Sequence, residues 1–144
     1  MNTERVRVDY TPDGDTIRVW RTIGNRVESV RIRLAFIDAP ELSDKASYPY
    51  AVSARAYLRR LLALNETVEA RIQGMDHWGR LIAEVVSLRT YAYCGLRLVE
   101  GGYAALWNCP QSRGEYYAAQ DIAQRKQRGI WRINGPWQAP WRYR

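Results

Sequence analysis

Lysine, cysteine and histidine are scarce in this sequence, and each shortage narrows the classes of protein that it can encode. Lys45 and Lys126 are the only lysines among 22 basic residues, so arginine supplies most of the positive charge. Cys94 and Cys109 are too few for a disulfide framework and form no CxxC zinc motif; whether they pair stays open. His77, the one histidine, lies in an expected turn, where histidine is more often solvated than catalytic.

Long apolar runs are also missing. No stretch approaches the length that spans a membrane, and residues 1–5 carry no apolar signal region. We therefore expect a soluble protein without a membrane partner, and its compartment stays open between secreted, periplasmic and cytoplasmic. Because no long apolar seam is visible, we also expect a monomer.

The sequence does contain enough hydrophobic residues to fold, together with an excess of arginine. At 144 residues and 47% hydrophobic content, it fits one globular domain with its own core. The formal net charge is +7. Because a planar guanidinium binds phosphate oxygens in pairs, this composition favours nucleic acid or another polyanion as partner. The alternatives are simple solubility and a coding bias toward arginine.

Hydrophobic periodicity predicts five strands and three helices. The expected strands cover residues 5–10, 16–21, 27–37, 68–73 and 80–88, and the expected helices cover 49–62, 96–100 and 115–128. Short antiparallel strands with a helix inserted after the third are typical of a small barrel. We therefore predict an α+β, mainly β fold: a five-stranded Greek-key barrel of the OB type with three helices.

Several local features follow from the same patterns. Gly14 is free to take a positive φ in the turn after the first strand. Tyr117, Ile122 and Ala123 are the expected inner face of the last helix. The tail from Trp131 onward is rich in proline and tryptophan. We expect it to pack as an extended segment, with its tryptophans against the barrel rather than stacked on bases.

Four acids lie where two neighbouring strands are expected to end. Asp13 and Asp15 belong to the first turn, and Asp38 and Glu41 flank Pro40 after the third strand. If the two strands pair, these ends come close together, and clustered carboxylates repel one another unless a cation neutralises them. A hard ion with oxygen ligands, Ca²⁺ or Mg²⁺, would serve. The alternative is an Asx turn at Asp13 and loop geometry at Asp38.

Two arginines accompany these acids. Arg33 precedes an apolar stretch and is expected to be partly buried, which requires an acid or a bound anion beside it. Arg80 follows the turn at residues 76–79, at another expected end of the barrel. Either arginine could instead make a structural ion pair. Because Arg33 and Asp38 are an odd number of residues apart, they share one face only if a bend or bulge separates them.

Together these motifs resemble the staphylococcal nuclease (thermonuclease) family. The matching segments are Asp13-Gly14-Asp15-Thr16, Arg33 with Ile37-Asp38-Ala39-Pro40-Glu41, Asp76-His77-Trp78-Gly79-Arg80, Leu98-Val99-Glu100-Gly101-Gly102-Tyr103-Ala104 and Gln127-Arg128-Gly129-Ile130-Trp131. The resemblance implies an OB barrel with three helices and a Ca²⁺-dependent nuclease acting on DNA and RNA. It also implies cleavage of the 5′ P–O bond, which leaves 3′-phosphate ends. The closing Pro-Trp-Arg-Tyr-Arg is similar to the tails of bacterial members.

The resemblance also implies roles for individual residues. It assigns three ligands to the calcium ion: the carboxylates of Asp15 and Asp38, and the backbone carbonyl of Ala39. Glu41 matches the residue that acts as general base or orients the attacking water. Arg33 and Arg80 match the two arginines that hold the reacting phosphate.

The sequence departs from the family around the expected substrate. The loop after Glu41 is shorter and carries a single lysine, Lys45. His77 and Trp78 replace a Lys-Tyr pair beside the second arginine, and Trp78 could either stack on a base or pack on its loop. The family's tyrosines after the second helix have no clean match in the segment 107–110. We name Lys45, His77 and Trp78 as candidate substrate contacts.

We assign residues 1–131 to an OB-fold nuclease domain and residues 132–144 to a Pro/Trp-rich tail packed on the same domain. Two alternatives to a nuclease stay open. One is a non-catalytic OB module that binds single-stranded nucleic acid, and the other is a basic structural protein that uses arginines only to anchor phosphates. The nuclease is favoured because the whole matching set is present: Asp15, Arg33, Asp38, Glu41 and Arg80.

Overall fold

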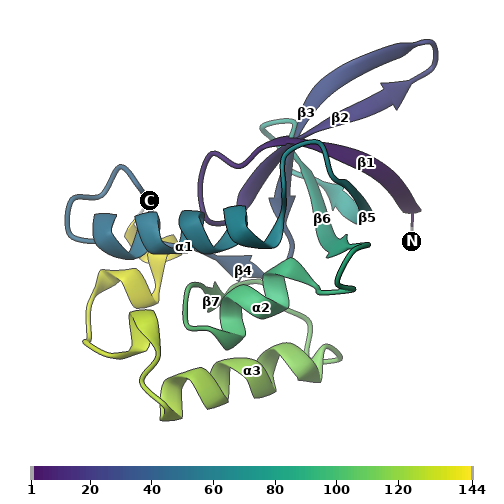
Figure 1. The fold of residues 1–144 in the computed structure, drawn as a ribbon. Helices are drawn as coiled ribbons and strands as arrows, with labels where there is room; N and C mark the ends of the chain where they lie inside the picture. The colour runs from purple at the N-terminus through teal and green to yellow at the C-terminus, as the bar shows by residue number, and fades with distance from the viewer. Residues whose placement is uncertain (1, 144) are drawn as a thin grey trace.

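A closed barrel of five strands forms the centre of the molecule in the computed structural model, which describes residues 2–143 (Figure 1). The barrel strands are β1 (Asn2–Tyr10), β2 (Thr16–Ile23), β3 (Arg26–Leu34), β5 (Thr67–Met75) and β6 (Leu81–Ser87). Their order around the barrel is β1-β2-β3-β6-β5. Three helices accompany it: α1 (Tyr48–Leu61), α2 (Cys94–Glu100) and α3 (Gly114–Arg125). The predicted mainly β, OB-type barrel with three helices is confirmed.

Closure of the barrel depends on one parallel pair. β3 and β6 run in the same direction, with Ile32 opposite Leu81 and Leu34 opposite Ala83, whereas the other barrel pairs are antiparallel. The prediction of antiparallel strands throughout was therefore wrong at this pair. The physical reason is the long connection between β3 and β6, which contains α1 and β5 and lets the chain re-enter in the same direction.

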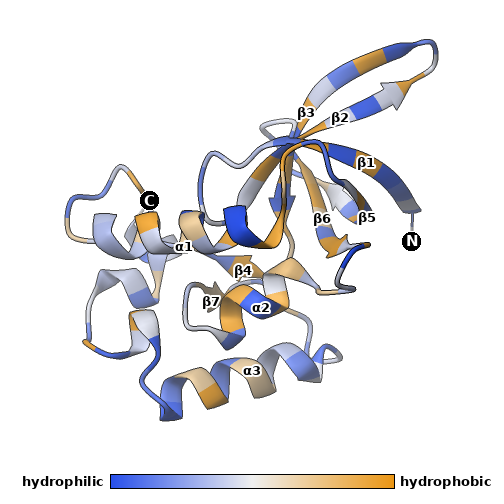
Figure 2. Cartoon of the chain, viewed as in Figure 1, coloured by the Kyte–Doolittle hydropathy of each residue, from blue (hydrophilic) through white to orange (hydrophobic). Residues whose placement is uncertain are grey.

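The strand pattern explains where the core lies. Hydrophobic and hydrophilic residues alternate along the β2–β3 hairpin, whose far end projects beyond the barrel (Figure 2). Val19 and Ile32 of this hairpin are buried in the core, whereas Ile23 and Val27 near its tip are exposed. The hairpin turn contains Gly24 at φ 62°, a backbone conformation that favours glycine.

Glycine is required at position 14 by close packing rather than by its backbone conformation. Gly14 is not among the described residues with positive φ, so its freedom to take that conformation is not used here. A Cβ at this position would instead collide with the Cβ of Ala54 on α1 and crowd Ala39. Glycine is therefore required because α1 packs directly against the turn between β1 and β2.

A buried carboxylate sets the rotation of α3. Glu84 of β6 is 3% exposed and accepts a hydrogen bond from the Tyr116 hydroxyl at 2.7 Å and another from Arg113 Nη2 at 2.8 Å. This contact turns Tyr116 inward, and Tyr117 and Ile122 are left 42% and 37% exposed. The predicted inner face was wrong at those two positions, because apolar spacing alone did not reveal this polar anchor.

The C-terminal tail folds into short 3₁₀ helices rather than the predicted extended segment. They are η1 (Gly129–Trp131), η2 (Pro136–Gln138) and η3 (Pro140–Tyr143). Proline suits such turns because its φ is already fixed near the helical value. The Trp137 ring stacks on Tyr50 of α1 with centroids 4.7 Å apart, which holds the tail beside that helix (Figure 1).

The remaining features of the fold concern the two cysteines and the lengths of the helices. Cys94 and Cys109 are both free thiols, so they do not pair. Among the helices of residues 2–143, none is long and apolar enough to cross a bilayer.

Candidate active site

A sharp bend after β3 brings the predicted site together. β3 ends at Leu34, Phe36 takes φ 74°, and the chain continues as the short strand β4 (Ile37–Asp38), which pairs with β7 (Ala105–Leu106). The bend places Asp38 Oδ1 2.9 Å from Arg33 Nη2. The irregularity that the odd spacing of Arg33 and Asp38 required is therefore present, as a turn rather than a bulge.

Arg33 lies between two buried carboxylates. Its side chain is 6% exposed, and Nη2 lies 2.9 Å from Asp38 Oδ1 and 3.5 Å from Asp15 Oδ2. Nη1 donates a hydrogen bond to the Leu34 carbonyl at 3.1 Å. One guanidinium thus lies between two acids, one just before the start of β2 and the other at the end of β4.

Asp15 connects the start of β2 to the end of β4. The Ala39 backbone N–H donates to Asp15 Oδ2 at 2.8 Å, and the Thr16 hydroxyl donates to Asp15 Oδ1 at 3.2 Å. These hydrogen bonds fix the carboxylate beside Arg33. The three residues named as calcium ligands, Asp15, Asp38 and Ala39, therefore lie together in the structure.

Asp13 adds a third carboxyl to this neighbourhood. Its Oδ1 accepts a hydrogen bond from the Asp15 N–H at 3.0 Å, which is the Asx turn considered above. Burial raises the pKa of Asp13 to about 7, and the charge of Asp15 adds to the effect. The Asx turn and the carboxylate cluster are thus compatible.

Asp76 holds Arg80 in the turn that joins β5 and β6. Asp76 Oδ2 accepts from Arg80 Nε at 2.7 Å, and Oδ1 accepts from the backbone N–H groups of Arg80 and Trp78 at 2.9 and 3.0 Å. Burial alone would raise the pKa of Asp76, but these hydrogen bonds together hold it below its ordinary value. Arg80 also lies 5.6 Å from the centroid of the Trp78 ring.

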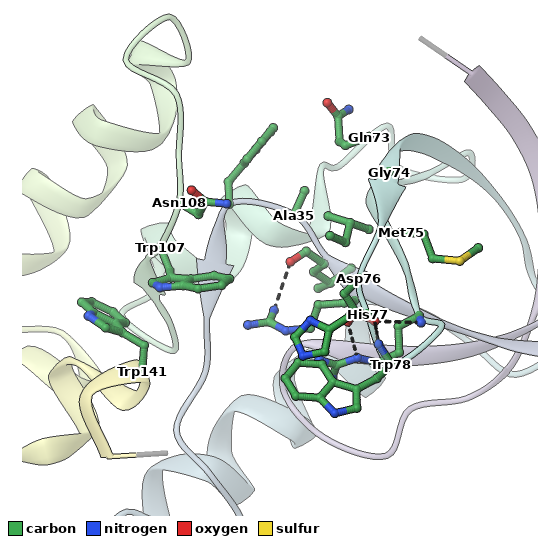
Figure 3. Close-up of a pocket in the computed structure, with 15 residues that line it drawn as sticks. Ala35, Gln73, Gly74, Met75, Asp76, His77, Trp78, Trp107, Asn108 and Trp141 are labelled. Carbon is green, nitrogen blue, oxygen red and sulfur yellow. Dashed lines mark hydrogen bonds and ion pairs between the residues drawn. The ribbon is translucent and has the colours of Figure 1, made fainter.

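Both arginines line one cavity of about 580 Å³ (Figure 3). Its walls are largely apolar and include four aromatic residues: Phe36, Trp78, Trp107 and Trp141. Guanidinium groups bind phosphate, and flat rings bind bases. The cavity therefore has the two kinds of group that a nucleotide needs.

The remaining predicted residues lie around this centre. His77 and Trp78 line the cavity, and their rings lie 3.7 Å apart at the centroids. Glu41 is half-buried in a second depression, together with Asp44, Pro136 and Tyr143, and Lys45 is exposed in the same loop. Glu41 thus follows Asp38 closely in sequence but opens onto a neighbouring hollow.

Two tryptophans that line the cavity were not predicted as site residues from the sequence. Trp107 lies directly after β7, in the segment that takes the place of the family's tyrosines, and that position was the available signal. Trp141 lies in the tail, where nothing in the sequence distinguishes it from the packing residue Trp137.

The donors at the strand ends fit a hard cation. Carboxylate oxygens are ligands that Ca²⁺ prefers, and one oxygen each of Asp15 and Asp38 lies within 3.5 Å of the same Arg33 nitrogen. Within residues 2–143, no group of three or more His, Cys, Asp or Glu side chains is arranged to hold a metal. The candidate ligands for a metal ion are therefore two carboxylates, those of Asp15 and Asp38, and the backbone carbonyl of Ala39.

These features define an OB-type barrel with a cationic, aromatic-walled cavity. Residues 31–133 match the family described as staphylococcal nuclease homologue, and the chain belongs to that family.

The sequence is also similar to several proteins that are named as endonucleases. The chain is 27% identical to the probable endonuclease LCL3 of Paracoccidioides brasiliensis, over 96% of this chain and 51% of that protein. It is 28% identical to the LCL3 protein of Uncinocarpus reesii, over 87% of this chain and 51% of that protein. It is also 27% identical to endonuclease YhcR of Bacillus subtilis, over 90% of this chain and 11% of that protein. The chain thus spans about half the length of these LCL3 relatives, and a bacterial source stays a prediction.

Proposed function

We propose that this protein is a Ca²⁺-dependent nuclease that hydrolyses phosphodiester bonds in DNA or RNA. One observation carries the proposal: Arg33, buried between Asp15 and Asp38, lines the same cavity as Arg80. A purely structural ion pair would need neither a second arginine nor an adjoining cavity. Family membership and the endonuclease names of the relatives support a nuclease as the general class.

Asp15, Asp38 and the carbonyl of Ala39 are the residues that would hold the calcium ion. Both carboxylates lie within 3.5 Å of the same Arg33 nitrogen, so their oxygens lie in a common region. When bound, the ion would supply Lewis-acid stabilisation of the reacting phosphate.

The two arginines would bind the phosphate undergoing attack. Each guanidinium is already oriented, Arg33 by Asp38 and Arg80 by Asp76. Their hydrogen bonds to the non-bridging phosphate oxygens strengthen as negative charge develops in the transition state. Glu41 would orient the attacking water and accept its proton. We propose that the 5′ P–O bond breaks and a 3′-phosphate end is left.

Three further residues are proposed to contact the substrate. His77 and Trp78 line the cavity beside Arg80, and Lys45 lies exposed in the loop after Glu41, where it can meet a neighbouring phosphate. We also propose that residues 1–131 form the nuclease domain and that residues 132–144 pack on it; residues 1 and 144 lie outside the described part of the chain.

A cleavage assay tests this function. Single-stranded DNA is incubated with the wild type in Ca²⁺ or EDTA, and with Glu41→Gln in Ca²⁺. We expect EDTA to abolish cleavage and Glu41→Gln to lower the rate on the order of a hundredfold. Glu100→Gln, an exposed acid on α2, is the control and should cleave like the wild type. The DNA is labelled at its 5′ end, so a change in the mobility of the labelled product on phosphatase treatment identifies a 3′-phosphate end. Cleavage that ignores both EDTA and Glu41→Gln would contradict the proposal.

One observation favours a non-catalytic module as the competing function. Arg33 and Arg80 share one cavity with Trp78 and Trp107, and guanidinium groups and aromatic faces can bind a single strand without hydrolysing it. A binding module would retain oligonucleotide and show no Ca²⁺-dependent cleavage in the same experiment.

A further inference from the structure

Trp141 lies in a place that its sequence position does not suggest. The family match ends at residue 133, yet Trp141 lines the cavity that contains Arg33 and Arg80. In Figure 3 its ring projects from the C-terminal segment beside that of Trp107, which comes from the loop after β7. Two tryptophans from distant parts of the chain therefore contribute to one wall region of this cavity.

The tail is built to hold Trp141 in this position. Pro140, the preceding residue, is buried, and Gln138 Nε2 donates to the Ile130 carbonyl at 2.9 Å. Trp137 Nε1 donates to the Ile133 carbonyl at 2.9 Å. The ring of Trp137 is already used for packing on α1, whereas that of Trp141 faces the cavity, so the two tail tryptophans differ in function.

The distances suit a nucleotide. The Arg33 guanidinium lies 6.0 Å from the centroid of the Trp107 ring, so a phosphate bound at Arg33 brings its own sugar and base to the aromatic wall. The cavity volume of about 580 Å³ lies in the range of small-molecule binding sites. Aromatic faces next to a cationic group are the features with which proteins bind single-stranded nucleic acid.

We propose that Trp141 is a specificity-determining residue that stacks, together with Trp107, on an unpaired base of the nucleotide whose phosphate lies at Arg33. This proposal rests on the proposed nucleic-acid function, but it concerns binding and needs no catalysis. A base inside a duplex is already stacked and paired, so it enters such a cavity only after extrusion. The tail therefore directs this protein toward single strands.

Equilibrium binding in EDTA tests the proposal, because cleavage then does not intervene. A short fluorescein-labelled oligothymidylate is titrated with the wild type, Trp141→Ala and Trp141→Phe, and anisotropy is measured. The stacking contribution of one base predicts a loss of about five- to 150-fold for Trp141→Ala. Trp141→Phe keeps an aromatic face and should bind within about threefold of the wild type.

Two comparisons make the result specific to base stacking. The same oligonucleotide with abasic sites, and a duplex, should bind equally to the wild type and Trp141→Ala. Tyr91→Ala removes an aromatic side chain that is 77% exposed outside the cavity, and it should bind like the wild type. Thermal melting of each variant checks that it is folded.

Several outcomes would overturn the inference. They are binding by Trp141→Ala within twofold of the wild type, an equal loss on the abasic strand, or no measurable binding by the wild type. Failure of the proposed catalytic function looks different: the wild type would bind oligothymidylate with the expected Trp141 dependence, yet would not cleave DNA in Ca²⁺.

Discussion

At the scale of single residues, Arg33 determines the chemistry of the site. It is 5% exposed and faces Asp38, which is fully buried, and Asp15. Removing charged groups from water is costly, so a buried ion pair is weak evidence for stability by itself. Under the proposed function its value is geometric, because it fixes the guanidinium and both carboxylates before a phosphate would bind.

This arrangement predicts the effect of removing the guanidinium. Arg33→Ala removes a hydrogen-bonded guanidinium from the buried Asp38 carboxylate and should lower the free energy of unfolding by about 3–5 kcal/mol in EDTA. The double variant Arg33→Ala/Asp38→Asn should recover much of this loss, because asparagine carries no charge that the guanidinium would have to balance. Urea denaturation followed by circular dichroism measures both.

An exposed arginine provides the comparison for Arg33. Arg125 pairs with Asp121 on α3, and its side chain is 70% exposed, so Arg125→Ala should change stability by at most about 0.5 kcal/mol. If the double variant at positions 33 and 38 were no more stable than Arg33→Ala, the charge explanation would be wrong.

At the scale of secondary-structure elements, the β5–β6 hairpin positions the second arginine. Asp76 accepts hydrogen bonds from the backbone and side chain of Arg80 and from the Trp78 backbone, so one carboxylate organises the whole turn. The same carboxylate keeps Arg80 directed along the cavity that Arg33 also lines.

The pH dependence of stability should reveal this anchor. Because the folded-state pKa of Asp76 lies below that of the unfolded chain, its stabilisation is present above about pH 4 and is lost as the pH falls through the folded-state value. Asp76→Asn should therefore cost about 1–2 kcal/mol at neutral pH, and this cost should shrink as the pH falls through the folded-state pKa of Asp76. Denaturation at several pH values measures the difference.

The control for Asp76 lies on β5, the strand that leads into the turn containing Asp76. Glu69 pairs with Arg71, and the two side chains are 25% and 38% exposed, so Glu69→Gln should cost at most about 0.5 kcal/mol. An Asp76→Asn penalty that stays constant down to pH 2 would show that the carboxylate charge is not responsible.

At the scale of the whole molecule, the net charge of +7 and the arginine content should govern association with a nucleic acid under the proposed function. Each phosphate contact releases counterions from the nucleic acid, so affinity falls as salt rises. Contacts by Arg33 and Arg80 alone predict a loss of roughly sevenfold in affinity for a single strand between about 50 and 200 mM salt.

The slope of this salt dependence distinguishes a phosphate contact made in the cavity from electrostatic attraction between the nucleic acid and the whole protein surface. Arg80→Gln should make the slope of log affinity against log salt shallower by about 0.7, as expected for one lost phosphate contact. Arg125→Gln, on an exposed part of α3, should leave the slope unchanged. Equal effects of the two substitutions in anisotropy titrations would mean that the cavity arginine is not a specific phosphate contact.

Sequence by itself determined the barrel and the helices, and it named the candidate residues of the site. Alternating residues such as Val6 and Val8 specify strands because side chains of a strand point alternately to its two faces. The odd spacing of Arg33 and Asp38 even required the bend that Phe36 makes. Such features depend on local chain geometry, which neighbouring residues encode.

Only the tertiary structure decided how distant segments meet. The rotation of α3 depends on Glu84, the requirement for glycine at position 14 depends on α1, and the place of Trp141 depends on contacts with segments earlier in the chain. None of these follows from periodicity, because burial of a polar group or approach of a neighbouring backbone is a property of the packed molecule. The sequence therefore named the arginines and acids, and packing decided which aromatic residues surround them.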